Sequence, residues 1–229
     1  MNLKKEREGL DILEDFLYPL IFTIFIYSGI RAFLFEARYI PSGSMLPILE
    51  IQDRLFIEKL TFKRRSPQRG DIVVFNSPYR FDKELIHLRE KKIPSKFLCS
   101  IISFPIISSL NFFSDPTCDA YIKRIVAIEG DQVFVDSSGR VFINGNLIKE
   151  SFNPNYCINS FTGKGFCKIL NIEVPESNYV VLGDNRGNSW DSRYWPGGPF
   201  LPYNEIIGRA SWRFWPLNRF GSISEKYHD

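Results

Sequence analysis

The chain has 229 residues, of which 44% are hydrophobic and 24% are charged. These proportions are ordinary for a globular protein and exclude a disordered chain. The 29 basic and 26 acidic residues leave a net charge of +3, which is too balanced to indicate nucleic acid as a partner. The length suits one domain, or one domain joined to a membrane segment.

The N-terminal region has the pattern of a membrane anchor. Basic residues are present in residues 1–15, and an apolar run interrupted only by Arg31 follows at residues 16–35. About 20 helical residues are needed to cross a hydrocarbon core ~30 Å thick, and a long cationic side chain near the end can reach the headgroups. We therefore predict one transmembrane helix at 16–35, with residues 1–15 in the cytoplasm.

Two alternatives to a transmembrane anchor fit the same segment less well. A cleavable signal peptide needs small residues before its cleavage site, but Phe35 occupies such a position. A buried helix of a soluble domain usually has a polar face, and this run has none.

From residue 36 onward the pattern changes to short strands bounded by turn residues. Asn144-Gly145, between two apolar runs, is typical of a type I′ hairpin. We predict strands at residues 53–58, 71–76, 121–129, 132–136, 140–143, 179–182 and 206–214. The expected fold of residues 36–229 is mainly β, an antiparallel β-sheet or barrel-like domain.

An insertion at about residues 79–119 interrupts the strand pattern. Its segment 97–113 is uncharged and rich in Ile, Phe and Ser, at the lower length limit for a second membrane span. Pro105 in its middle disfavours a continuous helix.

The chain has four cysteines, Cys99, Cys118, Cys157 and Cys167, and none forms a C-x-x-C pair. A zinc ribbon is therefore not indicated. Cys157 and Cys167 bracket a Gly-containing loop and either close it as a disulfide or remain free thiols. The same alternatives apply to Cys99 and Cys118.

Ser44 lies in the segment Pro41-Ser42-Gly43-Ser44-Met45-Leu46-Pro47, where small residues leave its hydroxyl open. A polar loop would show the same pattern, and a nucleophilic serine also needs a base. The sequence has only two histidines: His87 lies in a charged stretch and His228 is next to the C-terminal residue. A Ser-His-Asp triad is therefore not expected.

Lys123 is the alternative base, because it lies inside the apolar strand Tyr-Ile-Lys-Arg-Ile-Val-Ala-Ile. Alternation places Lys123 on one face with Tyr121 and Ile125, while Arg124 points to the other face. Burial can lower a lysine pKa by the roughly 2.5–3.5 units that general base catalysis at neutral pH requires. A lysine whose ammonium reaches solvent would give the same sequence pattern.

Residues 183–193 follow an apolar strand and are dense in Asp, Asn and Ser, which form local side-chain-to-backbone bonds that rigidify a loop. The spacing of an EF-hand and its closing Glu are missing, so we predict no metal site.

Three of these segments, 41–47, 121–131 and 183–193, together with Arg-Gly-Asp-Ile-Val-Val-Phe at 69–75, resemble the ordered sequence boxes of bacterial type I signal peptidases. The resemblance implies Ser44 as nucleophile and Lys123 as general base, without a cofactor. It also implies Ser42 and the Ser44 amide as oxyanion donors. Ser189 would orient the lysine, and Asp191 would fix the loop through Arg193 or Arg124. Gly187 departs from the pattern, which often has an acidic residue there.

The resemblance implies a serine endopeptidase of the bacterial cytoplasmic (inner) membrane. It would cleave signal peptides from exported precursor proteins, with small residues preferred at positions −1 and −3. Its catalytic domain would lie on the extracytoplasmic side. Segment 97–113 would then rest on the surface or at the lipid interface, since one crossing would separate Ser44 from Lys123. Two alternatives are a related Ser-Lys processing protease and a membrane-tethered β domain that binds peptides.

Overall fold

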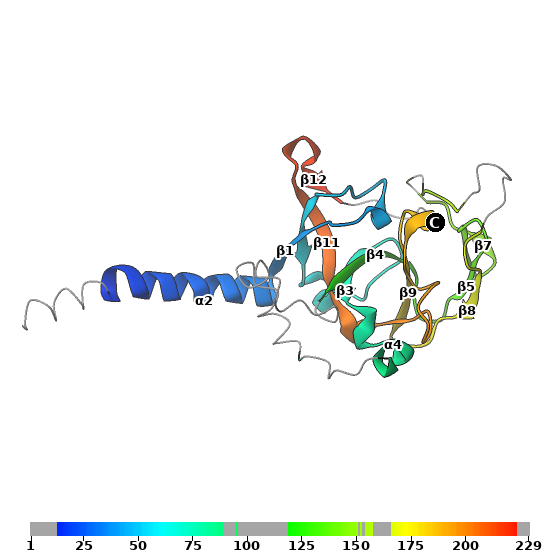
Figure 1. Cartoon of the computed structure of the whole chain (residues 1–229), viewed down its shortest axis with the longest axis horizontal. Helices are drawn as coiled ribbons and strands as arrows, with labels where there is room; N and C mark the ends of the chain where they lie inside the picture. Colours follow the sequence, from blue (N-terminus) through cyan, green and yellow to red (C-terminus); the bar gives the residue numbers. More distant parts are fainter. Residues whose placement is uncertain are drawn as a thin grey trace, which may run out of the picture.

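The molecule consists of an N-terminal helix that projects from a body of β-strands (Figure 1). The computed structural model describes residues 13–88, 95, 119–150, 152, 154–157 and 166–223. A π-helical turn, Leu13–Leu17, leads into α2, Tyr18–Phe33, where Pro19 is tolerated because it occupies the first turn. In the described part of the chain, no helix is both long enough and apolar enough to cross a membrane.

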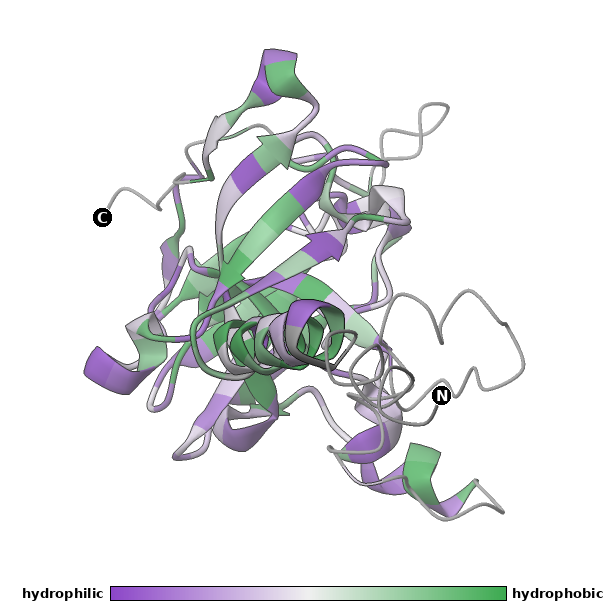
Figure 2. Cartoon of the chain, turned by 90° about the vertical axis from the view of Figure 1, so that its left-hand side faces the viewer, coloured by the Kyte–Doolittle hydropathy of each residue, from purple (hydrophilic) through white to green (hydrophobic). Residues whose placement is uncertain are grey.

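The apolar side chains of α2 are exposed rather than packed against the strands. Exposed fractions lie between 43% and 74% for Tyr18, Leu20, Ile21, Phe22, Ile24, Phe25, Ile26, Tyr27, Ile30 and Phe33. The helix is predominantly hydrophobic when viewed along its axis (Figure 2). It ends two residues earlier than the predicted segment, because Phe35 already pairs with Glu58 in the sheet.

The larger sheet is antiparallel throughout and has the order β1-β2-β11-β3-β4-β9-β10, with β12 paired to β11. In this order the strands are β1 (Phe35–Tyr39), β2 (Arg54–Glu58), β11 (Ile206–Trp215), β3 (Ile72–Asn76), β4 (Ala120–Ala127), β9 (Asn178–Leu182) and β10 (Leu201–Pro202), with β12 at Gly221–Ser222. All seven predicted strands are present, and the mainly β fold is confirmed.

A smaller antiparallel sheet has the order β7-β6-β5-β8 and lies on the side of the body away from α2 (Figure 1). Its strands are β5 (Gln132–Val135), β6 (Val141–Ile143), β7 (Asn146–Leu147) and β8 (Leu170–Glu173). Asn144 and Gly145 both have positive φ, 51° and 82°, as a type I′ turn between β6 and β7 requires. The hairpin prediction is therefore confirmed.

Short helical turns connect the strands. They are η2 (Gly43–Met45), α3 (Thr61–Arg64), η3 (Pro78–Arg80), α4 (Lys83–His87), η5 (Arg186–Asn188), η6 (Tyr203–Glu205) and η7 (Leu217–Arg219). The predicted insertion thus begins within η3 and contains α4. Segment 97–113 and the pair Cys99 and Cys118 lie outside the described residues.

Apolar clusters cover both faces of the larger sheet. One contains Met45, Leu49, Leu55, Ile57, Ile72 and Val74, and the other contains Phe75, Ile125, Val181 and Trp195. Met45 and Leu49 are fully buried on either side of a short loop, so they fix the turn that carries Ser44 to the edge of the sheet.

Candidate active site

The turn that carries Ser44 is held by a loop from the far end of the chain. Ser44 lies in η2, and its carbonyl accepts a hydrogen bond from the Asn185 amide at 3.1 Å. The Asn185 side chain donates from Nδ2 to the Gly43 carbonyl at 3.0 Å. These two bonds join segments about 140 residues apart and fix the backbone on which the Ser44 hydroxyl stands.

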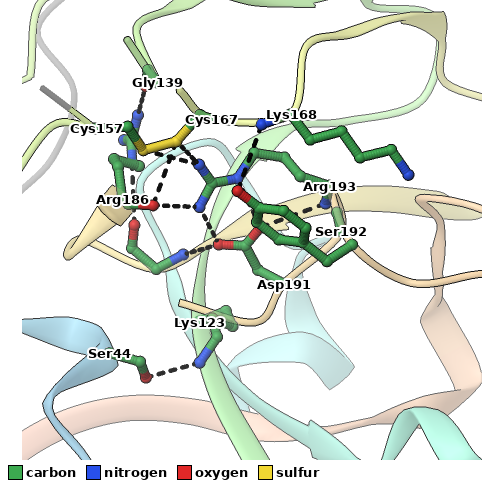
Figure 3. Close-up of polar contacts among 12 residues, drawn as sticks. Ser44, Lys123, Gly139, Cys157, Cys167, Lys168, Arg186, Asp191, Ser192 and Arg193 are labelled. Carbon is green, nitrogen blue, oxygen red and sulfur yellow. Dashed lines mark hydrogen bonds and ion pairs between the residues drawn. A yellow bond between two sulfur atoms is a disulfide. The ribbon is translucent and has the colours of Figure 1, made fainter. Parts of the chain in front are cut away.

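Lys123 reaches this hydroxyl from the middle of β4. Its Nζ donates to Oγ of Ser44 at 2.8 Å (Figure 3). It also donates to the carbonyl of Ile122 at 2.9 Å. The side chain is buried, with 4% of its surface exposed. The predicted pairing of Ser44 and Lys123 in space is therefore present in the structure.

The surroundings of Lys123 favour its neutral form. Burial is the largest influence and lowers its pKa to about 8. The carboxylates of Asp191 and Asp184 act in the opposite direction, and the Arg193 guanidinium lowers the pKa further. Among the described residues, neither hydrogen bond of Nζ goes to a carboxylate. With a pKa of about 8, roughly a tenth of the amine is unprotonated at pH 7, far more than for an ordinary lysine.

Ser42 stands beside the pair. Its Oγ lies 3.5 Å from Oγ of Ser44, and its backbone is extended, with φ −134° and ψ 156°. The hydroxyl is on the same side of the turn as the Ser44 hydroxyl, where an oxyanion donor is needed. Its role as a donor stays a prediction.

Asp191 forms its ion pair with Arg193 at 2.8 Å, and both side chains are fully buried. Of the two partners that the sequence left open, the structure therefore gives Arg193. Arg124 instead pairs with Asp184 at 2.7 Å and 2.8 Å and donates to the Gly70 carbonyl. Asp191 also accepts from the Gly183 amide at 3.0 Å, which fixes the start of the loop.

Ser189 was expected to orient Lys123, but the described structure shows no hydrogen bond between their side chains. Its Oγ is buried, and in the described part of the chain it has no hydrogen-bond partner. A Cβ on Gly183 would lie 2.2 Å from this oxygen and 2.5 Å from the Ser44 carbonyl, so only glycine fits between them. Ser189 therefore packs close to the backbone of Ser44, while its role in orienting Lys123 stays a prediction.

A cleft of about 720 Å³ opens over the Ser44 and Lys123 side chains. One wall is formed by residues 38–42, at and after the end of β1, and the other by Asp119, residues 120–123 of β4, Asn188 and Trp190. Tyr121 belongs to the second wall and packs against Trp190 with ring centroids 5.8 Å apart. An extended peptide can enter between the two walls and reach the hydroxyl.

The structure adds residues that the sequence patterns did not single out. Gly183 and Asn185 contact the Ser44 backbone, and Asp184 neutralises the buried Arg124. In the sequence these residues form the run Gly-Asp-Asn directly after an apolar strand. That pattern predicted a rigid loop but not which residues the loop contacts. No group of three potential metal ligands occurs among the residues that the structure describes.

The sequence matches the profile of a peptidase family described as signal peptidase, peptidase S26, over residues 13–215. A probable signal peptidase I-2 of Synechocystis sp. is 36% identical over 225 residues, covering 97% of this chain and 82% of the relative. A signal peptidase I of Leptolyngbya laminosa is 36% identical over 204 residues, covering 88% and 79%.

A solved structure of a signal peptidase I from Enterococcus faecalis is 21% identical, with a TM-score of 0.39. The match covers 64% of this chain and 98% of the other. This likeness is too weak to add to the sequence matches.

Proposed function

The chain belongs to the signal peptidases of peptidase family S26, and we propose that it cleaves signal peptides from precursor proteins with a dyad of Ser44 and Lys123. The observation that carries the proposal is the 2.8 Å separation of the lysine Nζ and the serine Oγ in a buried site. Membership of this family sets aside a non-enzymatic peptide-binding domain.

The reaction is acyl transfer in two steps. The neutral amine of Lys123 takes the proton from Ser44, whose Oγ attacks the scissile carbonyl. The Ser44 amide and the Ser42 hydroxyl hold the oxyanion that forms. The Lys123 ammonium then gives its proton to the leaving amine, after which the same amine activates water to release the ester.

The cleft supports a substrate bound as an added strand. β1 is an end strand of the sheet, paired only with β2 in the described structure. Residues 120–123 of β4 pair with β3 but precede the register with β9, which begins at Arg124. Two strand edges therefore face the cleft, and a peptide bonded to them would place alternate side chains, such as those at −1 and −3, on the same side.

Placement at a membrane is the second part of the proposal. The apolar segment 16–35 anchors the enzyme as a single pass in the bacterial cytoplasmic membrane, with its N-terminus in the cytoplasm and the catalytic domain outside. Its support is the exposed apolar surface of α2, which burial in lipid would remove from water. The disulfide between Cys157 and Cys167 agrees with an oxidising, extracytoplasmic location.

The test of the cleavage reaction uses the full chain in detergent with a secretory precursor, read on a gel. We expect one cut after the signal peptide by the unchanged protein and none by Ser44→Ala. Equal cleavage by Ser44→Ala would disprove the nucleophile assignment.

The anchor is tested separately by extracting membranes at alkaline pH. We expect the full chain in the membrane pellet and a chain without residues 1–34 in the supernatant. Recovery of both proteins in the supernatant would disprove the anchor without affecting the cleavage result.

A further inference from the structure

The disulfide between Cys157 and Cys167 lies on the side of Arg193 and Asp191 that faces away from the catalytic pair (Figure 3). Its two cysteines are buried, with 1% and 5% of their surfaces exposed. The Cys157 amide donates to Ser138 and the Cys167 amide to Ser137, each at 2.8 Å. The bridge is thereby fixed to the turn between β5 and β6, which gives it a rigid base.

Arg193 packs its guanidinium against this bridge. Its Nη1 contacts both sulfur atoms, and its Nη2 donates to the Arg186 carbonyl at 2.9 Å. Nε and Nη2 both donate to the Asp191 carboxylate at 2.8 Å. Arg193 is fully buried, and each of its three guanidinium nitrogens has a protein partner.

The contacts continue from Arg193 to the catalytic serine. Asp191 accepts from the Gly183 amide, and Gly183 lies against the Ser44 carbonyl. The next two residues along the loop are Asp184 and Asn185, and the Asn185 amide donates to that same carbonyl. A displacement of Arg193 would therefore be transmitted to the backbone of Ser44 through only two side chains and one loop.

We propose that the Cys157–Cys167 disulfide is a positioning group for the Ser44–Lys123 pair, acting through Arg193 and Asp191. The inference rests on the proposed function and deepens it. Reduction by a dithiol breaks the S–S bond, with two electrons and two protons converting it to two thiols while the reductant becomes a disulfide. Bonded sulfur atoms are ~2.05 Å apart, whereas two thiols need van der Waals separation. In a closely packed interior that extra space must come from the Arg193 side.

The test compares steady-state kinetics of the full chain with those of Cys157→Ala/Cys167→Ala, using a soluble peptide that spans a signal-peptide cleavage site. We expect kcat to fall by about 10- to 100-fold with KM nearly unchanged, because a shift of about 1 Å in reacting groups has an effect of this size. The matched control is Ile143→Ala, which opens a cavity in the smaller sheet away from Arg193. It should lower the melting temperature but leave kcat unchanged.

A double-mutant cycle with Arg193→Lys identifies the route of the effect. If the bridge acts through Arg193, the triple variant should be no slower than the slower of its two parents. If the fold-loss of kcat in the triple variant equalled the product of the losses in its two parents, the proposal would be overturned. Treating the folded, unsubstituted enzyme with a dithiol reductant should reproduce the loss of kcat, so the result does not depend on variants that fail to fold.

The pH profile adds a readout that a purely structural bridge would not move. Asp184 and Asp191 raise the pKa of Lys123, and Arg193 lowers it. A loosened Arg193 would lower it less, so the rising limb of kcat should move to higher pH in the variant without the bridge. An unmoved limb with unchanged kcat would overturn the inference while leaving the dyad intact, whereas no cleavage by the unsubstituted chain would refute the proposed function itself.

Discussion

The two faces of β4 bury neighbouring basic side chains, one with a carboxylate partner and one without. Lys123 and Arg124 are adjacent and expose only 4% and 1% of their surfaces. Arg124 has a bidentate carboxylate partner in Asp184 and stacks over Phe152 at 4.3 Å. Lys123 bonds instead to a hydroxyl and a carbonyl. A buried cation with a carboxylate stabilises the loop, and one without a carboxylate is available as a base.

The largest expected effect is the loss of kcat when Lys123 is substituted. Lys123→Met removes the one base that the described part of the structure places in contact with the serine hydroxyl, and it keeps the volume of the side chain. We expect kcat to fall by about 10⁴-fold or more while the protein stays folded, as measured with purified protein and a signal-peptide substrate. Near-normal turnover by this variant would falsify the base assignment.

Substitution of Arg124, on the other face of β4, should lower the stability of the fold. Arg124→Met leaves Asp184 buried without its cation, so we expect a loss of about 3–5 kcal/mol in the free energy of unfolding. Denaturant titration of the detergent-solubilised protein measures it. The control is Arg140→Met, because Arg140 is half exposed and its pair with Asp136 should contribute less than about 1 kcal/mol. Equal losses would remove the distinction between buried and exposed pairs.

Substitution of Ser42, beside the nucleophile, tests whether a second side chain takes part in catalysis. Ser42→Ala deletes the proposed second oxyanion donor, so kcat should fall about 100- to 1,000-fold, or about 2.7–4 kcal/mol in transition-state stabilisation. Burst-phase and steady-state kinetics with the same substrate would separate this loss from weaker binding. A change confined to KM would assign Ser42 to substrate binding instead.

The smallest expected effect is a gain in stability when the lysine is removed. The folded pKa of Lys123 is about 8, against a reference value of 10.5. Below pH 8 both the folded and the unfolded state bind the proton, and the fold bears the full cost of the buried charge, roughly 3 kcal/mol. This cost shrinks between pH 8 and 10.5 as the folded amine loses its proton first.

Lys123→Met should therefore be more stable than the unchanged protein by up to that amount at pH 6–7, and the difference should decline toward pH 10. Unfolding curves at several pH values measure the trend. A gain that does not change with pH would mean that the amine is not protonated on burial.

Local patterns were enough to predict much of this fold. The seven strands expected from alternation and β-branched residues all form, because each pattern is set by neighbours along the chain. Asn144 and Gly145 predicted their turn for the same reason. β1 was missed, since Glu36 and Arg38 break its apolar pattern. Glu36 is buried there through ion pairs with Arg38 and Lys59, which no local pattern reveals.

The sequence by itself determined that Ser44 sits in a turn of small residues and that Lys123 lies inside an apolar strand, because composition and alternation act over a few residues. Only the tertiary structure decided that the lysine Nζ and the serine Oγ lie 2.8 Å apart. It also decided that Arg193 rather than Arg124 pairs with Asp191, and that the Asn185 amide bonds to the turn that carries Ser44. Such pairings depend on packing between segments that are far apart in the chain, where several partners of suitable charge compete and geometry selects one.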